Sequence, residues 1–113
     1  MRRLLLFACT LASCAQGPEA DLASIGEARS LAAEWALVNQ QAAAGHLTAI
    51  YVRTMHASLR EQIQSAAQSL SQPQSDYGRE VASLLREPDD AAPQTLRAHA
   101  DRLRQVEKRL ESA

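Results

Sequence analysis

Residues 24–70 read SIGEARSLAAEWALVNQQAAAGHLTAIYVRTMHASLREQIQSAAQSL, and this stretch decides the fold. Apolar side chains recur at spacings of three and four on both sides of Gly45, which is the pattern of two amphipathic helices. The first stripe is Ala28, Leu31, Trp35, Val38 and Ala42, and the second is Val52, Met55, Leu59, Ile63, Ala66 and Leu70. Gly45 suits the left-handed conformation that closes a helix, and Thr48 suits the cap of the next. The stretch therefore predicts an antiparallel helical hairpin.

The first helix is predicted to start at Ser24, because Ser24-Ile25-Gly26-Glu27 has the Ser-x-x-Glu form of a capping box. The same residues are compatible with a single helix of more than 40 residues that carries Gly45 inside it. Thr48 can cap a second helix and Leu47 before it can pack on Val52 as a hydrophobic staple, which favours the break. The hairpin is our prediction, and the continuous helix stays open as the alternative.

Two further amphipathic segments follow the hairpin. Residues 76–86 place Tyr77, Val81, Leu84 and Leu85 on one face and end before Pro88. Pro93 suits the first turn of a last helix, whose stripe is Leu96, His99, Leu103, Val106 and Leu110. The sequence therefore predicts an all-α domain over residues 24–113: a small antiparallel helical bundle with two longer helices as a hairpin, a short third helix and a C-terminal fourth helix.

The composition agrees with helices and excludes several classes of protein. Alanine and leucine, with 22 and 15 residues, enter helices at little cost, and only 4% of residues are aromatic, so the core must be aliphatic. A length of 113 residues excludes a multidomain enzyme, and a net charge of −1 gives no electrostatic basis for binding nucleic acid. Two cysteines are too few for a disulfide scaffold or a four-cysteine metal site.

The first 14 residues have the layout of an export signal. Arg2-Arg3 precedes an apolar run that is too short to span a bilayer and that ends in Leu11-Ala12-Ser13-Cys14. This ending resembles the lipobox of bacterial lipoprotein precursors. The resemblance implies that residues 1–13 are a signal peptide, that cleavage falls between Ser13 and Cys14, and that Cys14 carries the lipid. Beyond the leader, the chain looks like small, uncharacterised helical lipoproteins of bacteria, which offer no functional residue to transfer.

The same resemblance implies a location. An acylated Cys14 would hold the chain at a membrane, with residues 14–23 serving as the lipidated cysteine and a tether. The next residue is Ala15 rather than an aspartate, which in Gram-negative lipoproteins favours the outer membrane, with the chain facing the periplasm. The alternative is a soluble periplasmic protein, cut after Ala15 by a signal peptidase that attaches no lipid.

Three histidines are the main candidates for chemistry in the helical region. His46 falls in the predicted turn, and His56 is expected at the surface or its boundary. His99 takes a core position among leucines, so we expect it to pack, and packing alone predicts that His99→Leu keeps or raises stability. Binding of a metal or small ligand by His99 is the alternative. No phosphate-binding, haem-attachment or His-Glu-x-x-His motif is present, so we predict no catalytic residue, no metal site and no cofactor.

These features together favour a role without catalysis. We expect a membrane-anchored periplasmic lipoprotein whose helical domain is a structural or protein-interaction module of the cell envelope. Its expected partners are the membrane, through Cys14, and either an envelope protein or a second copy of the chain. An alanine-rich core with few large side chains stabilises the fold only modestly, so association would add stability. A small-ligand or metal-binding bundle that uses His99 is the alternative function.

Overall fold

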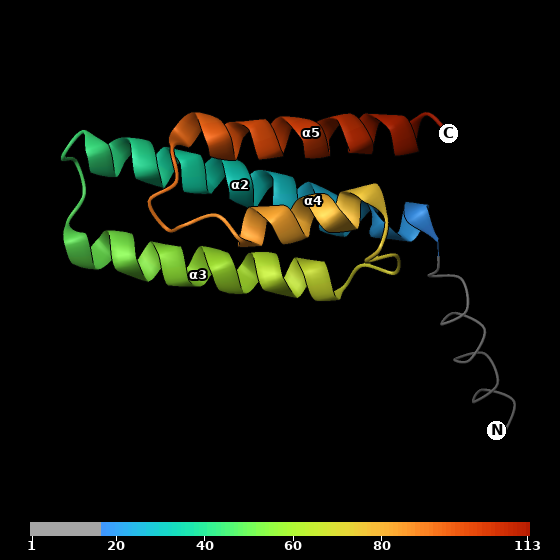
Figure 1. The fold of residues 1–113 in the computed structure, drawn as a ribbon, viewed down its shortest axis with the longest axis horizontal. Coiled ribbons are helices and arrows are strands. Elements are labelled where there is room, and N and C mark those ends of the chain that lie inside the picture. Colours follow the sequence, from blue (N-terminus) through green and yellow to red (C-terminus); the bar gives the residue numbers. More distant parts are fainter. Residues whose placement is uncertain (1–16) are drawn as a thin grey trace, which may run out of the picture.

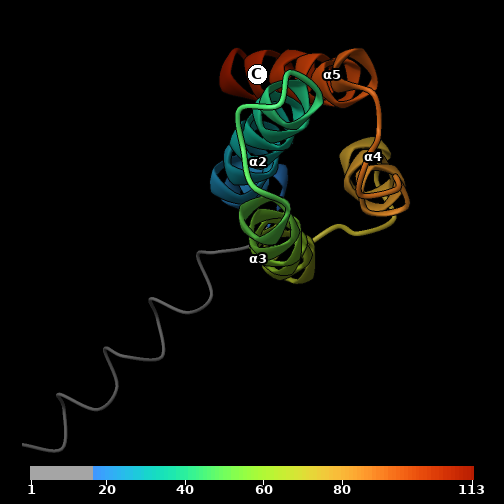
Figure 2. The same cartoon turned by 90° about the vertical axis from the view of Figure 1, so that its left-hand side faces the viewer.

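A computed structural model describes residues 17–113, and all regular secondary structure in this range is helical. A short 3-10 helix, η1 (Pro18–Asp21), leads into α2 (Leu22–Ala43), and the chain continues through α3 (Ala49–Gln68), α4 (Asp76–Leu85) and α5 (Pro93–Glu111). The four α-helices lie side by side along one long axis (Figure 1), and an end-on view shows them around a common centre (Figure 2). The predicted all-α bundle is confirmed, including the short third helix.

The predicted hairpin is also confirmed, and the continuous helix is wrong. Gly45 has φ 77°, in the left-handed region, and its N–H donates to the Ala42 carbonyl at 3.0 Å, which ends α2. The Thr48 hydroxyl oxygen accepts the Tyr51 N–H at 3.2 Å and caps α3, as predicted. The chain therefore reverses over five residues, and α3 returns along α2 (Figure 1).

The core is formed by the predicted stripes of the four helices. Trp35 of α2 is the largest fully buried side chain, and it lies among aliphatic residues from every helix. Ala42, Val52, Met55 and Leu110, at the ends of the stripes, are only partly buried. Full burial of a large aliphatic side chain contributes about 1.5–3 kcal/mol, so the middle of the bundle carries most of the hydrophobic stabilisation.

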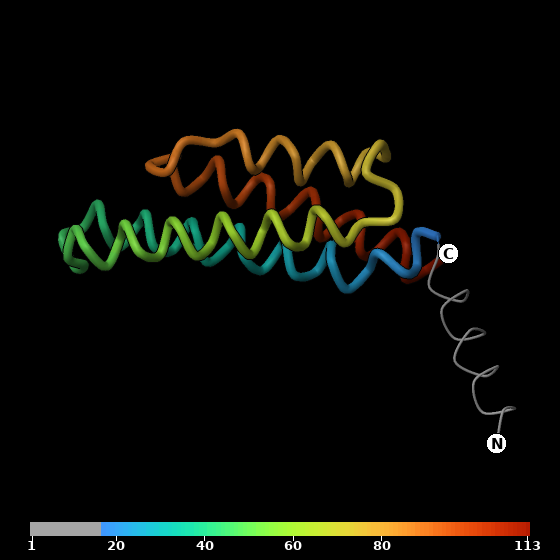
Figure 3. Tube along the Cα trace, turned by 90° about the horizontal axis from the view of Figure 1, so that it is seen from below, coloured from blue at the N-terminus to red at the C-terminus, as the bar shows by residue number. Residues whose placement is uncertain are grey.

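Residues at both ends of α4 limit its length. The Ser75 hydroxyl caps its first turn by accepting the Gly78 N–H at 3.2 Å. Gly78 lies against the preceding loop so closely that a Cβ atom there would be 2.3 Å from the Pro73 carbonyl oxygen, which excludes larger residues. Pro88 then prevents continuation, and α4 has 10 residues where α3 has 20. As a result α3 extends well past α4 toward the α2–α3 turn (Figure 3).

The start of the helical domain differs from the prediction. α2 begins at Leu22, so Ser24 and Glu27 lie inside the helix and form no capping box. Residues 18–23 belong to η1 and the first turn of α2, so the folded domain begins before residue 24 and takes in part of the predicted tether. The predicted signal peptide, its Ser13–Cys14 cleavage position and lipidation of Cys14 fall outside the described residues. None of the helices within residues 17–113 combines the length and the apolar character needed to cross a membrane.

Asp21 explains why η1 belongs to the fold. Its side chain is 1% exposed and accepts hydrogen bonds from the Ser71 N–H at 2.8 Å, the Tyr77 hydroxyl at 2.7 Å, the Ser71 hydroxyl at 3.0 Å and the Gln72 N–H at 3.3 Å. Burial raises the pKa of this carboxyl, but the four donors outweigh burial and hold the pKa below its ordinary 3.8. Burial, together with the hydrogen bond to Asp21, raises the pKa of Tyr77 above 10.0. One carboxylate thus joins the start of α2 to the α3–α4 loop and to α4.

We expect Asp21→Asn to lower the free energy of unfolding by about 2 kcal/mol at pH 7, because an amide cannot accept all four hydrogen bonds. The pKa of Asp21 is lowered by folding, so its contribution is present above about pH 4 and is lost as the pH falls through the folded-state value. Urea unfolding at pH 7 and near pH 3 should therefore show a smaller difference at low pH. Glu19→Gln, at an exposed carboxyl in the same short helix, is the control. An equal loss at both pH values would contradict the assignment.

Candidate functional site

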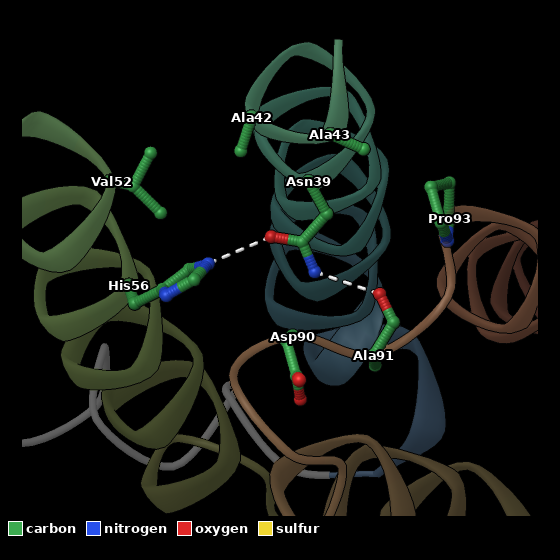
Figure 4. Close-up of a pocket in the computed structure, with 8 residues that line it drawn as sticks. All are labelled: Asn39, Ala42, Ala43, Val52, His56, Asp90, Ala91 and Pro93. Carbon is green, nitrogen blue, oxygen red and sulfur yellow. Dashed lines mark hydrogen bonds between the residues drawn. The ribbon is translucent and has the colours of Figure 1, made fainter. Parts of the chain in front are cut away.

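The short α4 leaves the end of the bundle near the α2–α3 turn uncovered on one side. A hollow of about 330 Å³ opens there, and we call it the inner hollow; its walls come from α2, α3, the α4–α5 loop (residues 86–92) and the start of α5 (Figure 4). It is lined by Asn39, Ala42, Ala43, Val52, His56, Asp90, Ala91 and Pro93. A wider and shallower outer hollow of about 490 Å³ adjoins it and is lined by Ala42, Leu47, Ala49, Val52, Arg53 and His56.

The α4–α5 loop is held in place by side chains of the hairpin. The Trp35 indole N–H donates to the Asp89 carbonyl at 2.9 Å. The Asn39 amide group donates both its hydrogens, to the Asp89 carbonyl at 2.9 Å and to the Ala91 carbonyl at 2.8 Å. Buried carbonyls without partners cost free energy, so these bonds determine the path of the loop and with it one wall of the inner hollow.

Arg60 of α3 holds the same loop from the other side. Its guanidinium donates to the Leu85 carbonyl at 2.9 Å, to the Glu87 carbonyl, and to the Asp89 carboxylate at 2.6 Å. It also lies over the Trp35 ring, 4.8 Å from the ring centroid. The Asp89 side chain is 58% exposed, so this ion pair contributes little. The two carbonyls at the C-terminal end of α4 are the more important contacts, because a cation there satisfies orphan acceptors.

His56 forms the polar floor of both hollows. Its Nε2 lies 2.7 Å from the Asn39 Oδ1 (Figure 4), and because that oxygen only accepts, Nε2 donates. In the neutral ring the other nitrogen, Nδ1, is then an acceptor, and no partner for it occurs within residues 17–113. His56 is 9% exposed and lines both hollows, so of the two expected positions the structure shows the boundary of the core rather than the open surface. One ring nitrogen of His56 is thus held by Asn39, and the other has no protein partner within the described residues.

His99 lies in a different cluster, between α5 and α4. It is 3% exposed, as its place on the stripe predicts. Its Nδ1 lies 2.5 Å from the Glu80 carboxylate and its Nε2 lies 2.7 Å from the Glu87 carboxylate, while Arg102 donates to Glu80 at 2.9 Å. The expectation that His99 stands alone among apolar side chains is therefore wrong. The Arg102 guanidinium also lies 3.3 Å from the His99 Nδ1, so the ring is enclosed by two carboxylates and a cation.

The His99 cluster has a structural geometry rather than that of a metal centre. The two carboxylates approach opposite nitrogens of the ring, so the three groups do not converge on one point. Among the described residues, no group of three or more His, Cys, Asp or Glu side chains is placed to hold a metal ion. His46 lies in the turn after α2, as predicted, and contacts Gln41 at 2.6 Å. The structure thus brings Asn39 and His56 together at the hollows and leaves His46 and His99 apart from them.

Sequence reasoning missed Asn39 and did not predict that His56 would be its partner, although a signal for each position was present. Asn39 lies four residues after Trp35, which places it on the buried face of α2. Asparagine is also a poor helix former, so its position inside an alanine-rich helix needed a reason. His56 lies three residues before Leu59, again on the buried face. Two polar residues at buried positions of paired helices are expected to form a hydrogen bond with each other.

We expect His99→Leu to lower the free energy of unfolding by about 2 kcal/mol, which reverses the expectation from packing alone. The reason is that Glu80 and Glu87, whose side chains are 17% and 23% exposed, would lose a donor at half-buried positions. Adding Glu87→Gln to the leucine variant removes the charge left unpaired, whereas Glu80 keeps its contact with Arg102, and this should recover part of the loss. Urea unfolding followed by circular dichroism measures the free energy of unfolding of the leucine variant and of the combined variant. A leucine variant as stable as the wild type would show that the cluster is dispensable.

The chain was compared with protein-family models, with curated proteins and with solved structures, and no match was found in any of the three. The geometry of the hollows and the sequence of the leader are therefore the features from which function is inferred.

Proposed function

We propose that this chain is a lipid-anchored module of the bacterial cell envelope that acts by binding another protein through the two hollows. The lipobox resemblance of Leu11-Ala12-Ser13-Cys14 supports the anchor, and by the same resemblance the chain faces the periplasm from the outer membrane. The proposal includes no catalytic step and no cofactor.

The observation that carries the proposal is the placement of the hollows relative to the start of the domain. Gly17 enters the domain beside Ser71, whose hydroxyl donates to the Gly17 carbonyl at 3.2 Å, at the end of the bundle where α3 finishes. The hollows are lined by residues next to the α2–α3 turn. This turn lies at the opposite end of the bundle from η1 (Figure 1). From Leu22 to Asn39 the helix α2 rises about 26 Å. An anchor at one end would thus present the hollows away from the membrane.

The distance from the anchor to the domain strengthens this orientation. Two residues, Ala15 and Gln16, separate Cys14 from Gly17, the first described residue of the domain. A chain of that length spans about 10 Å at most. The end of the domain that contains η1 would therefore stay close to the lipid surface, while the far end remains free to contact a partner.

The hollows have the features of a binding surface. Their walls are mostly alanine, valine, leucine and proline side chains, and the polar groups among them are few, with Asn39, His56 and Asp90 in the inner hollow and Arg53 in the outer one. Apolar walls with a few fixed polar groups are typical of recognition sites. The loop that forms one wall is fixed by hydrogen bonds from Trp35 and Asn39, so a partner would meet a surface that is already ordered, and less entropy is lost on binding.

The anchor is tested with a fatty-acid analogue fed to cells that produce the chain. We expect the wild type and the control variant Cys9→Ala to take up the label, because Cys9 belongs to the predicted signal peptide, and Cys14→Ala to remain unlabelled. Label that persists on Cys14→Ala, or a wild type that never takes up label, would refute the anchor.

The binding surface is tested with a photo-crosslinking amino acid introduced at Val52, which lines both hollows. In intact cells we expect defined crosslinked products from Val52 and none of the same mass from position 57, which is exposed on the same helix. Ala43→Arg, which places a large side chain in the wall of the inner hollow, should abolish the products, whereas Ala57→Arg should not. Identical products from positions 52 and 57 would contradict a specific surface.

A further inference from the structure

The charges around the two hollows are arranged asymmetrically. Arg53 borders the outer hollow and Asp90 borders the inner hollow. Both side chains are exposed, and neither takes part in an ion pair within residues 17–113. The residues that both hollows share, Ala42, Val52 and His56, lie between them. The surface thus has a weakly polar centre with a cation on one side and an anion on the other.

Such a surface is complementary to itself. A two-fold axis through its centre brings the same surface of a second molecule into contact and exchanges the two sides, so each Arg53 faces the Asp90 of the other copy. Ala42 and Val52, which both hollows share, would then lie near the axis and meet the second copy. One two-fold contact would pair both charges and cover both hollows.

We propose that the partner bound by the hollows is a second copy of this chain, held in a two-fold dimer by paired contacts between Arg53 and Asp90. This inference rests on the interaction function proposed above, but it does not depend on the lipid anchor. Ile50, which is 73% exposed and adjoins the outer hollow in sequence, provides further apolar surface at the margin of the contact.

The size of the surface indicates a weak dimer. A stable interface buries about 800 Å² per partner, whereas these hollows involve a few small side chains at one end of the bundle. Small interfaces are typical of transient complexes. Attachment of two copies to one membrane would raise their effective concentration, so a weak contact in solution becomes significant at a surface.

The test is sedimentation velocity of the full-length, unlipidated chain in reducing buffer, over concentrations from micromolar to millimolar. We expect the wild type to shift from monomer to dimer within this range. Arg53→Glu and Asp90→Arg each place like charges opposite one another twice, so each should weaken the dimer at least about tenfold. Glu61→Arg, at an exposed residue further along α3, is the control and should dimerise as the wild type does.

The decisive measurement combines the two charge variants. In an equal mixture of Arg53→Glu and Asp90→Arg, both contacts of a mixed dimer join opposite charges, so dimerisation should return. The double variant Arg53→Glu/Asp90→Arg should also dimerise with itself. Unfolding curves of the single variants should match that of the wild type, because both side chains are exposed and unpaired in the monomer.

Three results would overturn the proposal: a wild type that stays monomeric up to millimolar concentration, single variants that dimerise as well as the wild type, or a mixture that remains monomeric. The first result, combined with a crosslinked product from Val52 in cells, would instead assign the hollows to a different protein. In that case the binding function would stand and the second copy would be excluded. Loss of fatty-acid labelling would refute the anchor without affecting the dimer measurement.

Discussion

Hydrogen bonds from Trp35, Asn39 and Arg60 to carbonyls of the α4–α5 loop are the contacts on which the rest of the structure depends. They hold the loop against the α2–α3 hairpin, and α4 must therefore end where the loop begins. Because α4 ends early, the last turns of α2 and the first turns of α3 have no fourth helix over them. The hollows exist for this reason. The position at which the loop ends also sets where α5 starts, at Pro93.

A core that is rich in alanine gives these polar contacts more importance than they would have in a larger domain. Small side chains bury little area and fit together in several registers, so packing alone specifies the arrangement of helices weakly. Buried donors and acceptors are more selective, because a shift of one helix leaves them without partners. Asp21 at one end, His99 in the middle and Asn39 at the other end are each satisfied by groups on other elements. The register of the bundle is determined at three levels along its axis.

The sequence was sufficient to predict what depends on neighbouring residues. Gly45 and Thr48 locate the turn, Pro93 locates the start of α5, and the three-four spacing of Leu96 and Leu103 identifies a buried face. It was not sufficient where a side chain finds its partner far along the chain. Asp21 meets Ser71 and Tyr77, and His99 meets Glu80, through contacts that exist only once the helices have packed. The capping box at Ser24 failed for the same reason, since tertiary contacts of Asp21 start the helix earlier.

The two ends of the bundle differ in how completely their polar groups are satisfied. At the end where the chain enters, Asp21 accepts from donors on the α3–α4 loop and on α4, and the cluster is closed. At the other end, Asn39 uses both amide hydrogens and its oxygen, and one ring nitrogen of His56 has no protein partner within residues 17–113. No buried side-chain nitrogen or oxygen in this range lacks a hydrogen-bond partner, so this nitrogen is reached by water in the single molecule. A partner that seals it behind apolar atoms would leave it unpaired at a cost of about 1–3 kcal/mol, and a contact between two copies must therefore keep water at its centre.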